Sequence, residues 1–425
     1  MSSADRTTRR LFALEVVRQL QGAGYQAYWA GGCVRDRLLA REPKDYDVAT
    51  AATPDQIRAL FDRRRTLAIG AAFGVICVLG PVGAGQVEVT TFRSDASYSD
   101  GRRPDAVVFS SAEVDAQRRD FTINGLFYDP IAEQMHDFVG GRHDLEQGLV
   151  RAIGDPAARF REDKLRLLRA VRFAATFGFH LEPQTFAAVK VLAHEIHAVS
   201  AERISEEMRR MLAHPSRGVA ARLLAESGLL AAILPEMTPL TGDDPSVPAA
   251  ATTAWNQTLA VLDQLQSDSF ACGLAALLHQ VSRDPAFVAH LGRRWKLSLK
   301  EIEQTSWLLA RLDALAGARQ APWSNLQPLL VHEGIGELLA LHAARARVRV
   351  GELADAEFVQ AQLQRPAAEL NPPPLLTGDD LIEHGVPRGK EYKHLLEAVR
   401  AAQLDQLIQT RAEALALVDR RRQPG

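Results

Sequence analysis

The chain has 425 residues, of which 47% are hydrophobic and 24% are charged. This composition excludes a disordered protein, and the length predicts two to four domains rather than one core. The 50 basic and 52 acidic residues give a formal net charge of −2. A uniformly basic nucleic-acid-binding protein is therefore excluded, but a protein with a local basic stripe is not.

The first ten residues lack the apolar segment of a signal peptide. The uncharged stretch 66–87 is long enough to cross a bilayer, but glycines and a proline interrupt it repeatedly. We expect it to form one buried strand, GVICVLG, followed by a turn, and no membrane segment. The three widely spaced cysteines form no disulfide framework or CxxC metal motif, which favours the reducing cytoplasm.

The first 141 residues mix helix and strand patterns and predict an α/β head with a mixed sheet. LFALEVVRQLQ has helical spacing, and the strand YQAYWAGG is followed by the helix CVRDRLLA and the short strand DYDVAT. GVICVLG and QVEVTTF are expected to pair in an antiparallel manner, and so are LFYDP and MHDF.

After residue 141 the strand patterns stop. FREDKLRLLRAVRFAATF predicts one long amphipathic helix, and the remainder is rich in residues that favour helices. Proline-rich breaks occur at 235–248 and 365–374. We expect a catalytic head at 1–141, an all-α neck at 142–210, a helical body at 211–365 and a helical tail at 366–425.

Asp45 and Asp47 alternate with Tyr46 in a strand pattern, which predicts that both carboxylates lie on one face. Paired carboxylates repel each other, and Mg²⁺ with its hard oxygen ligands relieves that repulsion. Glu88 would join them if its strand neighbours theirs. Taken alone, the two aspartates fit a solvated loop better than a metal site, and Glu88 fits a surface position on a strand equally well.

Gly31 and Gly32 end a strand just before a helix that carries Arg35 in its first turn. Glycines allow close approach of a triphosphate, and a helix N-terminus favours anions. An ordinary strand-to-helix turn has the same residues.

Farther along, an aspartate and three arginines recur every three residues, as expected for one helix face or for simple surface ion pairs. They are Asp163, Arg166, Arg169 and Arg172.

GGCVRD followed by DYD resembles the polymerase-beta-like nucleotidyltransferase superfamily. Three later segments resemble motifs of the bacterial class II CCA-adding tRNA nucleotidyltransferases and their poly(A) polymerase relatives. These segments are RRDFTINGLFYDP (118–130), REDKLRLLRAVRFA (161–174) and ERISEE (202–207). The motifs occur in the family's order across residues 28–210.

This resemblance implies template-independent addition of nucleotides to the 3′ end of tRNA. A 3′-OH would attack the α-phosphorus of CTP or ATP, with two Mg²⁺ ions bridged by Asp45 and Asp47 and with help from Glu88. Asp163 and Arg166 would read the base, and Glu162 would hold them in place. Arg119 would contact the triphosphate, together with Arg169 and Arg172 unless these support the helix. Asp120 and Asn124 would contact the ribose, although Asp120 also fits a helix N-cap.

Residues 93–110 resemble the flexible loop and DxRRP element of full CCA-adding enzymes, and AAFGV (71–75) resembles the same branch. CCA addition is therefore favoured over poly(A) addition and over CC-only or A-only enzymes. A catalytically silent RNA-binding protein and a small-molecule nucleotidyltransferase are further alternatives. No obligate protein partner is evident from the sequence.

The second half resembles the helical HD pattern of metal phosphohydrolases, but with departures at its metal ligands. Gln257 replaces the first His, and His279 is followed by Gln280 in place of Asp. We therefore expect a helical body with His279 as a buried or capping residue rather than a hydrolase. The segment 374–420 resembles the family's tail, where Arg388, Lys390 and Lys393 are candidate contacts to tRNA phosphates.

Overall fold

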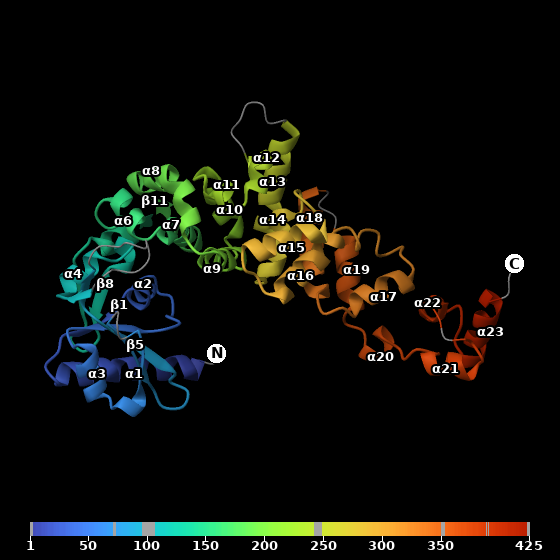
Figure 1. The fold of residues 1–425 in the computed structure, drawn as a ribbon, viewed down its shortest axis with the longest axis horizontal. Helices are drawn as coiled ribbons and strands as arrows, with labels where there is room; N and C mark the ends of the chain where they lie inside the picture. The colour runs from blue at the N-terminus through green and yellow to red at the C-terminus, as the bar shows by residue number, and fades with distance from the viewer. Residues whose placement is uncertain are drawn as a thin grey trace. The chain divides into compact units, whose positions relative to one another are not determined.

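The computed structural model describes residues 3–70, 74–95, 107–241, 249–349, 353–387, 389 and 391–422. The chain divides into two compact units (Figure 1). The first comprises residues 1–211 and 219–241, and the second comprises residues 212–218 and 242–425. The finer division into head, neck, body and tail stays a prediction.

A seven-stranded mixed sheet lies at the centre of the first unit, in the order β3-β4-β5-β2-β1-β8-β9. β2 is parallel to β5, and the other neighbours are antiparallel. Both predicted antiparallel pairs are confirmed, as is the α/β head. The strands are β1 (Ala27–Ala30), β2 (Asp47–Thr50), β3 (Thr66–Gly70), β4 (Val75–Leu79), β5 (Gln86–Thr91), β8 (Leu126–Asp129) and β9 (Gln134–Asp137).

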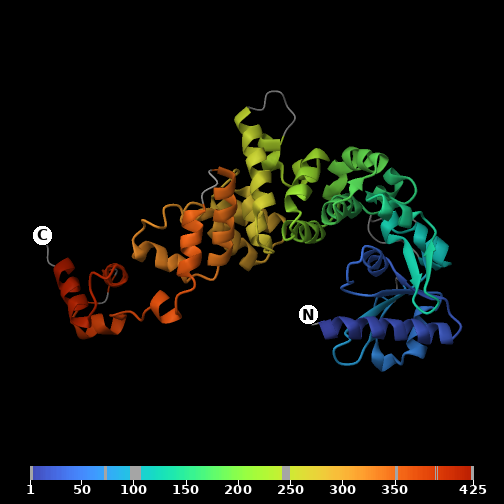
Figure 2. The same cartoon turned by 180° about the vertical axis from the view of Figure 1, so that it is seen from behind.

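The helix α1 (Ser3–Gly22) runs along the sheet and contacts β1, β2 and β5 (Figures 1 and 2). Its residues Phe12, Val16 and Leu20 recur every four positions and are buried. The other helices before residue 242 are α2 (Gly32–Leu38), α3 (Pro54–Leu60), α4 (Ala112–Gln117), α5 (Gly141–Glu146), α6 (Pro156–Glu162), α7 (Leu165–Phe177), α8 (Pro183–Leu192), α9 (Ala201–Leu212), α10 (Arg217–Glu226), α11 (Leu229–Ile233) and α12 (Thr238–Thr241).

The uncharged stretch 66–87 folds into the sheet. It supplies β3 and β4, which pair in an antiparallel manner, and the first residues of β5. The expected strand GVICVLG is confirmed as β4, whereas β3 was not predicted. In the part of the chain that the structure describes, no helix is long and apolar enough to span a membrane.

Short strands also occur outside the main sheet. β10 (Leu149–Val150) pairs in parallel with β11 (His180–Leu181), so the prediction of an all-α neck is corrected to a mostly helical one. Strands of two residues are too short to show any alternation in the sequence. β6 (Arg93–Asp95) and β7 (Val107–Phe109) form an antiparallel pair. Most of the predicted flexible loop, at 96–106, lies outside the described residues, as do residues 71–73 of AAFGV.

The long helix predicted from FREDKLRLLRAVRFAATF is interrupted. α6 ends at Glu162, α7 begins at Leu165, and Asp163 between them is extended, with φ −143° and ψ 104°. The Asp163 carboxylate accepts a hydrogen bond from the Leu165 backbone N–H at 3.1 Å. Aspartate competes in this way with helical hydrogen bonds, which explains the break that the periodicity did not reveal.

All regular elements in the described part of the second unit are helices, as predicted. Its last helices form a separate apolar cluster between Leu376 and Val418. The helices are α13 (Ala249–Gln264), α14 (Phe270–Leu278), α15 (Pro285–Arg294), α16 (Leu299–Ala310), α17 (Trp323–Leu330), α18 (Ile335–Arg349), α19 (Ala354–Gln362), α20 (Ala367–Leu370), α21 (Gly378–Glu383), α22 (Glu391–Leu404) and α23 (Arg411–Arg422).

Candidate active site

A cavity of about 590 Å³ lies in the first unit, between the sheet and the helices α2, α7 and α9. Its volume is in the range of small-molecule sites. All but two of the predicted site residues line it, the exceptions being Asp45 and Glu162. The lining residues are Gly31, Gly32, Arg35, Asp47, Glu88, Arg119, Asp120, Asn124, Asp163, Arg166, Arg169 and Arg172.

The carboxylates of Asp47 and Glu88 lie at one end of this cavity, on the neighbouring parallel strands β2 and β5. Asp47 is the register partner of Glu88, so the predicted neighbourhood of the two strands is confirmed. Partial removal from water and the negative charge of Glu88 raise the pKa of Asp47 to about 6, although Arg119 opposes the shift. A cation between the two carboxylates would relieve this repulsion.

Asp45 is placed differently from the prediction. β2 begins only at Asp47, which pairs with Ala30, the last residue of the antiparallel partner β1. The Asp45 side chain is 80% exposed and pairs with Arg9 Nη1 at 3.1 Å. The expectation that one strand holds both aspartates on one face is therefore wrong.

The donor set still suits a divalent cation, because carboxylate oxygens are its preferred ligands. Asp47 and Glu88 face the cavity together, and Asp45 precedes Asp47 by two residues. Among the described residues, no group of three or more His, Cys, Asp and Glu side chains is arranged around one point. Asp45 would have to exchange Arg9 for the metal to complete such a group.

The glycine turn brings the backbone close to Arg119. Gly31 has a φ of 68°, and a Cβ atom there would lie 2.9 Å from Arg119 Nη1. A side chain at this position would therefore be strained and would displace the guanidinium group. α2 begins directly afterwards at Gly32 and carries Arg35, which is only 8% exposed.

A chain of hydrogen bonds connects α2 to α7 through the RRDFTIN segment. Arg35 Nη1 donates to Asn124 Oδ1 at 2.6 Å, and Asn124 Nδ2 donates to Asp120 at 3.0 Å. Arg169 donates to the other Asp120 oxygen at 2.8 and 2.5 Å. Burial opposes ionisation of Asp120, but Arg169 and Asn124 lower its pKa to about 2. Asp120 also accepts from the Phe121 N–H at 2.8 Å, but the N-cap of the following helical turn is Phe121, so the alternative capping role of Asp120 is not realised.

The residues predicted to read the base have partners from other elements. Asp163 pairs with Arg203 of α9 at 2.8 Å, and Arg166 pairs with Glu162 at 2.7 Å. Glu162 therefore contacts Arg166, as expected for a residue that holds it in place. Arg172 pairs with Glu207 at 2.5 Å.

Several residues of the cavity were not singled out from the sequence. Arg118, Arg203 and Arg210 also line it, which gives eight arginines against four carboxylates and an excess of positive charge suited to a triphosphate. Asp115 is fully buried and binds both Arg118 and Arg119, at 2.8 and 3.0 Å. Arg118 and Arg203 lie inside the quoted motifs, so the motifs pointed to them, and the signal for Asp115 is its i, i+3 and i, i+4 spacing to Arg118 and Arg119.

The HD-like positions in the second unit form no metal site. Gln280 donates to Gln257 at 3.3 Å, so the two residues that stand in place of metal ligands bind each other. His279 is the C-cap of α14 and is buried, as predicted, with its Nδ1 2.7 Å from the Ala276 carbonyl oxygen.

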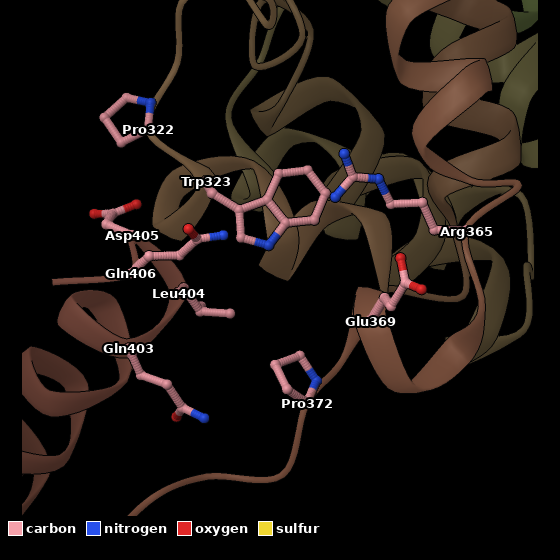
Figure 3. A pocket seen from close by; sticks show the side chains of 9 residues that line it. All are labelled: Pro322, Trp323, Arg365, Glu369, Pro372, Gln403, Leu404, Asp405 and Gln406. Carbon is pink, nitrogen blue, oxygen red and sulfur yellow. The ribbon is translucent and has the colours of Figure 1, made fainter. Parts of the chain in front are cut away.

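A second cavity, of about 730 Å³, lies around Trp323 in the second unit (Figure 3). Arg365 lies over the Trp323 ring at 5.0 Å. The polar groups of its walls mainly join α17 to the end of α22. Asp405 accepts hydrogen bonds from the backbone N and the Oγ of Ser324 at 2.8 and 2.7 Å, and Gln403 donates to the Pro373 carbonyl. Its walls therefore carry no arrangement comparable to the carboxylates and arginines of the first cavity.

Comparison with known protein families agrees with the site. Residues 27–151 match the family model of the poly A polymerase head domain. Residues 178–241 match the model described as the probable RNA and SrmB-binding site of polymerase A. The fold and the site thus define a nucleotidyltransferase of the poly(A) polymerase head class, and members of this class use divalent metal ions.

Comparison with individual proteins identifies the family within this class. A CCA-adding enzyme of Geobacillus thermodenitrificans is 35% identical over 412 residues, which cover 95% of each chain. A poly(A) polymerase I of Salmonella typhimurium is 43% identical, but over only 47% of this chain and 44% of its own. The crystal structure of the Bacillus stearothermophilus CCA-adding enzyme in complex with CTP matches with a TM-score of 0.75 and 28% identity, covering 96% and 97% of the two chains. The chain belongs to the family of CCA-adding enzymes.

Proposed function

We propose that this protein adds C, C and A to the 3′ end of tRNA, using CTP and ATP and releasing pyrophosphate. The observation that carries the proposal is the extent of the similarity. The CCA-adding relative matches head, neck, body and tail alike, over 95% of both chains. Family structures include complexes with CTP and with ATP, and one with tRNA.

Catalysis in this proposal depends on the carboxylates at the end of β2. Asp45 and Asp47 would hold two Mg²⁺ ions, with Glu88 assisting. When bound, Mg²⁺ supplies activation of the attacking oxygen and neutralisation of the developing charge. The arginines of the cavity hold the triphosphate, and Gly31 leaves room beside them. No covalent enzyme intermediate is needed, so positioning and charge stabilisation account for the rate.

Nucleotide choice belongs to Asp163 and Arg166. A carboxylate accepts a hydrogen bond from an exocyclic amine, which cytosine and adenine both possess, and a guanidinium donates to a ring nitrogen or carbonyl. Uracil offers no amine at this position. Arg203 and Glu162 form ion pairs with the two reading side chains, so neither depends on the ligand for its orientation.

Asp120 and Asn124 would support the ribose. Both already have protein partners, so they would act as a preorganised surface rather than as mobile groups.

A cytoplasmic location completes the proposal, supported by three free buried thiols, Cys33, Cys77 and Cys272.

The test uses tRNA that lacks its CCA end, together with single labelled nucleotides and their mixtures. We expect CTP alone to add two residues and CTP with ATP to add three, after which addition stops. Addition of C only would identify a CC-adding enzyme. ATP incorporation only onto tRNA that ends in CC would identify an A-adding enzyme.

Poly(A) addition is the second candidate, because the chain shares 43% identity over 211 residues with a poly(A) polymerase. The same assay separates the two functions. Long A tails on an RNA other than tRNA, made without CTP, would favour the polymerase.

A further inference from the structure

Two phenylalanine rings lie one turn apart on α7, between the arginines of the nucleotide cavity. Phe173 and Phe177 stack with their centroids 5.9 Å apart and their planes 11° apart. The i, i+4 spacing on a helix places them on the same face. Phe173 is buried and lines the cavity, whereas Phe177 is half-buried behind it.

Guanidinium groups lie over both rings. Arg35, from α2, is 4.5 Å from the Phe177 centroid and 5.3 Å from that of Phe173. Arg169 and Arg172 lie 5.2 and 4.2 Å from Phe173. The negative face of an aromatic ring attracts a cation, most strongly where water is excluded. The rings therefore offset the mutual repulsion of three cations that face the same cavity.

Arg35 is held on several sides. Its Nε and Nη2 donate to Asp36 at 2.9 and 2.7 Å, and its Nη1 donates to Asn124 at 2.6 Å. A guanidinium has five N–H donors, so these bonds leave two for a ligand. We propose that Phe173 and Phe177 form an aromatic platform that positions Arg35 to donate its remaining N–H groups to the triphosphate of the incoming nucleotide. This proposal rests on the proposed function.

Phe177 offers the cleanest test, because it does not line the cavity and can act on the nucleotide only through a neighbour. We expect Phe177→Leu to weaken CTP binding roughly threefold to tenfold, measured by calorimetry on the full chain without tRNA. KM for CTP should rise by the same factor while kcat changes little. Phe177→Tyr keeps the ring and should bind CTP like the wild type.

Phe179→Leu is the matched control. Phe179 is half-buried and packs on Phe177 at 5.7 Å between centroids, but no arginine lies over its ring among the described contacts. It should lower the melting temperature as Phe177→Leu does and leave CTP affinity unchanged. Arg41 also lies over Phe177, at 5.1 Å, but outside the cavity, so Arg41→Gln should not change CTP affinity either.

A double-mutant cycle with Arg35→Gln decides whether the platform acts through Arg35. We expect Phe177→Leu to have no further effect on CTP affinity once Arg35 is replaced. Additive losses, or equal losses from Phe177→Leu and Phe179→Leu, would overturn the platform while leaving Arg35 as a phosphate contact. Unchanged CTP affinity in Arg35→Gln itself would instead refute the triphosphate role of Arg35 in the proposed function.

Discussion

Asp47 is the residue on which the proposed chemistry depends most directly. It lines the cavity beside Glu88, and burial together with the negative charge of Glu88 raises its pKa to about 6. Asp47→Asn keeps the shape and removes the charge, so we expect nucleotide addition to fall at least about a hundredfold, with tRNA binding nearly intact. Single-turnover addition and filter binding measure the two quantities. Robust addition by this variant, or by Asp45→Ala, would contradict the assignment.

The second prediction for a single residue concerns Asp163 and the selectivity among nucleotides. Asp163→Ala removes the acceptor for the exocyclic amine, so we expect CTP and ATP incorporation to fall by roughly tenfold to a hundredfold. UTP incorporation should fall far less, because uracil never used that acceptor. Asp155→Ala, at an exposed N-cap of the neighbouring helix α6, is the control. Selectivity that stays at the wild-type level in Asp163→Ala would exclude a base-reading role.

The sequence predicted which way an individual side chain faces where the alternation of a strand covers that residue. Alternation along QVEVTTF indicated the face of Glu88, and its position beside Asp47 follows from the strand pairing. The partner of Asp45 could not be predicted, because Arg9 lies 36 residues away on another element. Asp115 differs, because it lies three and four residues before the arginines that it binds. This helical spacing could have indicated both ion pairs, although not that Asp115 is fully buried.

Secondary-structure elements were predictable where their signals were local, and not where a distant contact decided them. The order of the strands and helices that were predicted in the head follows from periodicity and glycines. The break between α6 and α7 does not, because the Asp163 carboxylate is held by Arg203 from α9 as well as by its own helix. Because of this break, the EDxxR segment is not one helix face. Asp163 lines the cavity from the extended connection between α6 and α7, and Arg166 lines it from α7.

The end of α14 gives a prediction about stability. Burial and nearby arginines lower the pKa of His279 to about 4, below its ordinary value of 6.5. Between these values only the unfolded chain binds the proton, so this contribution is complete above pH 6.5 and is lost as the pH falls. Between pH 7.5 and 5, the free energy of unfolding should fall by roughly 2 kcal/mol more in the wild type than in His279→Gln. Urea unfolding at both pH values measures this, and parallel losses would show that His279 does not titrate on unfolding.

At the scale of the whole molecule, the nucleotide cavity lies entirely between residues 30 and 210, whereas the last helices have their own apolar cluster. The four motifs therefore predicted the site and the fold class of the first unit. The second unit has no comparable motif, so its helices could be expected only as helices. The long match to CCA-adding relatives assigns that half to the same enzyme.

The tail gives the last prediction, which separates tRNA binding from nucleotide binding. Deletion of residues 366–425 should weaken tRNA binding and leave CTP affinity unchanged, because none of the described tail residues lines the nucleotide cavity. The dependence of log Kd on log salt should become shallower by roughly 0.7 to 0.9 for each lost phosphate contact.

Deletion also removes the Asp405 partner of Ser324, so a second variant is needed that keeps the tail. Replacing Arg388, Lys390 and Lys393 by Gln serves this purpose. Of the three, Lys393 is 80% exposed with Glu397 at 3.9 Å, while Arg388 and Lys390 lie outside the described residues. An unchanged salt dependence in both variants would mean that the tail does not bind tRNA phosphates.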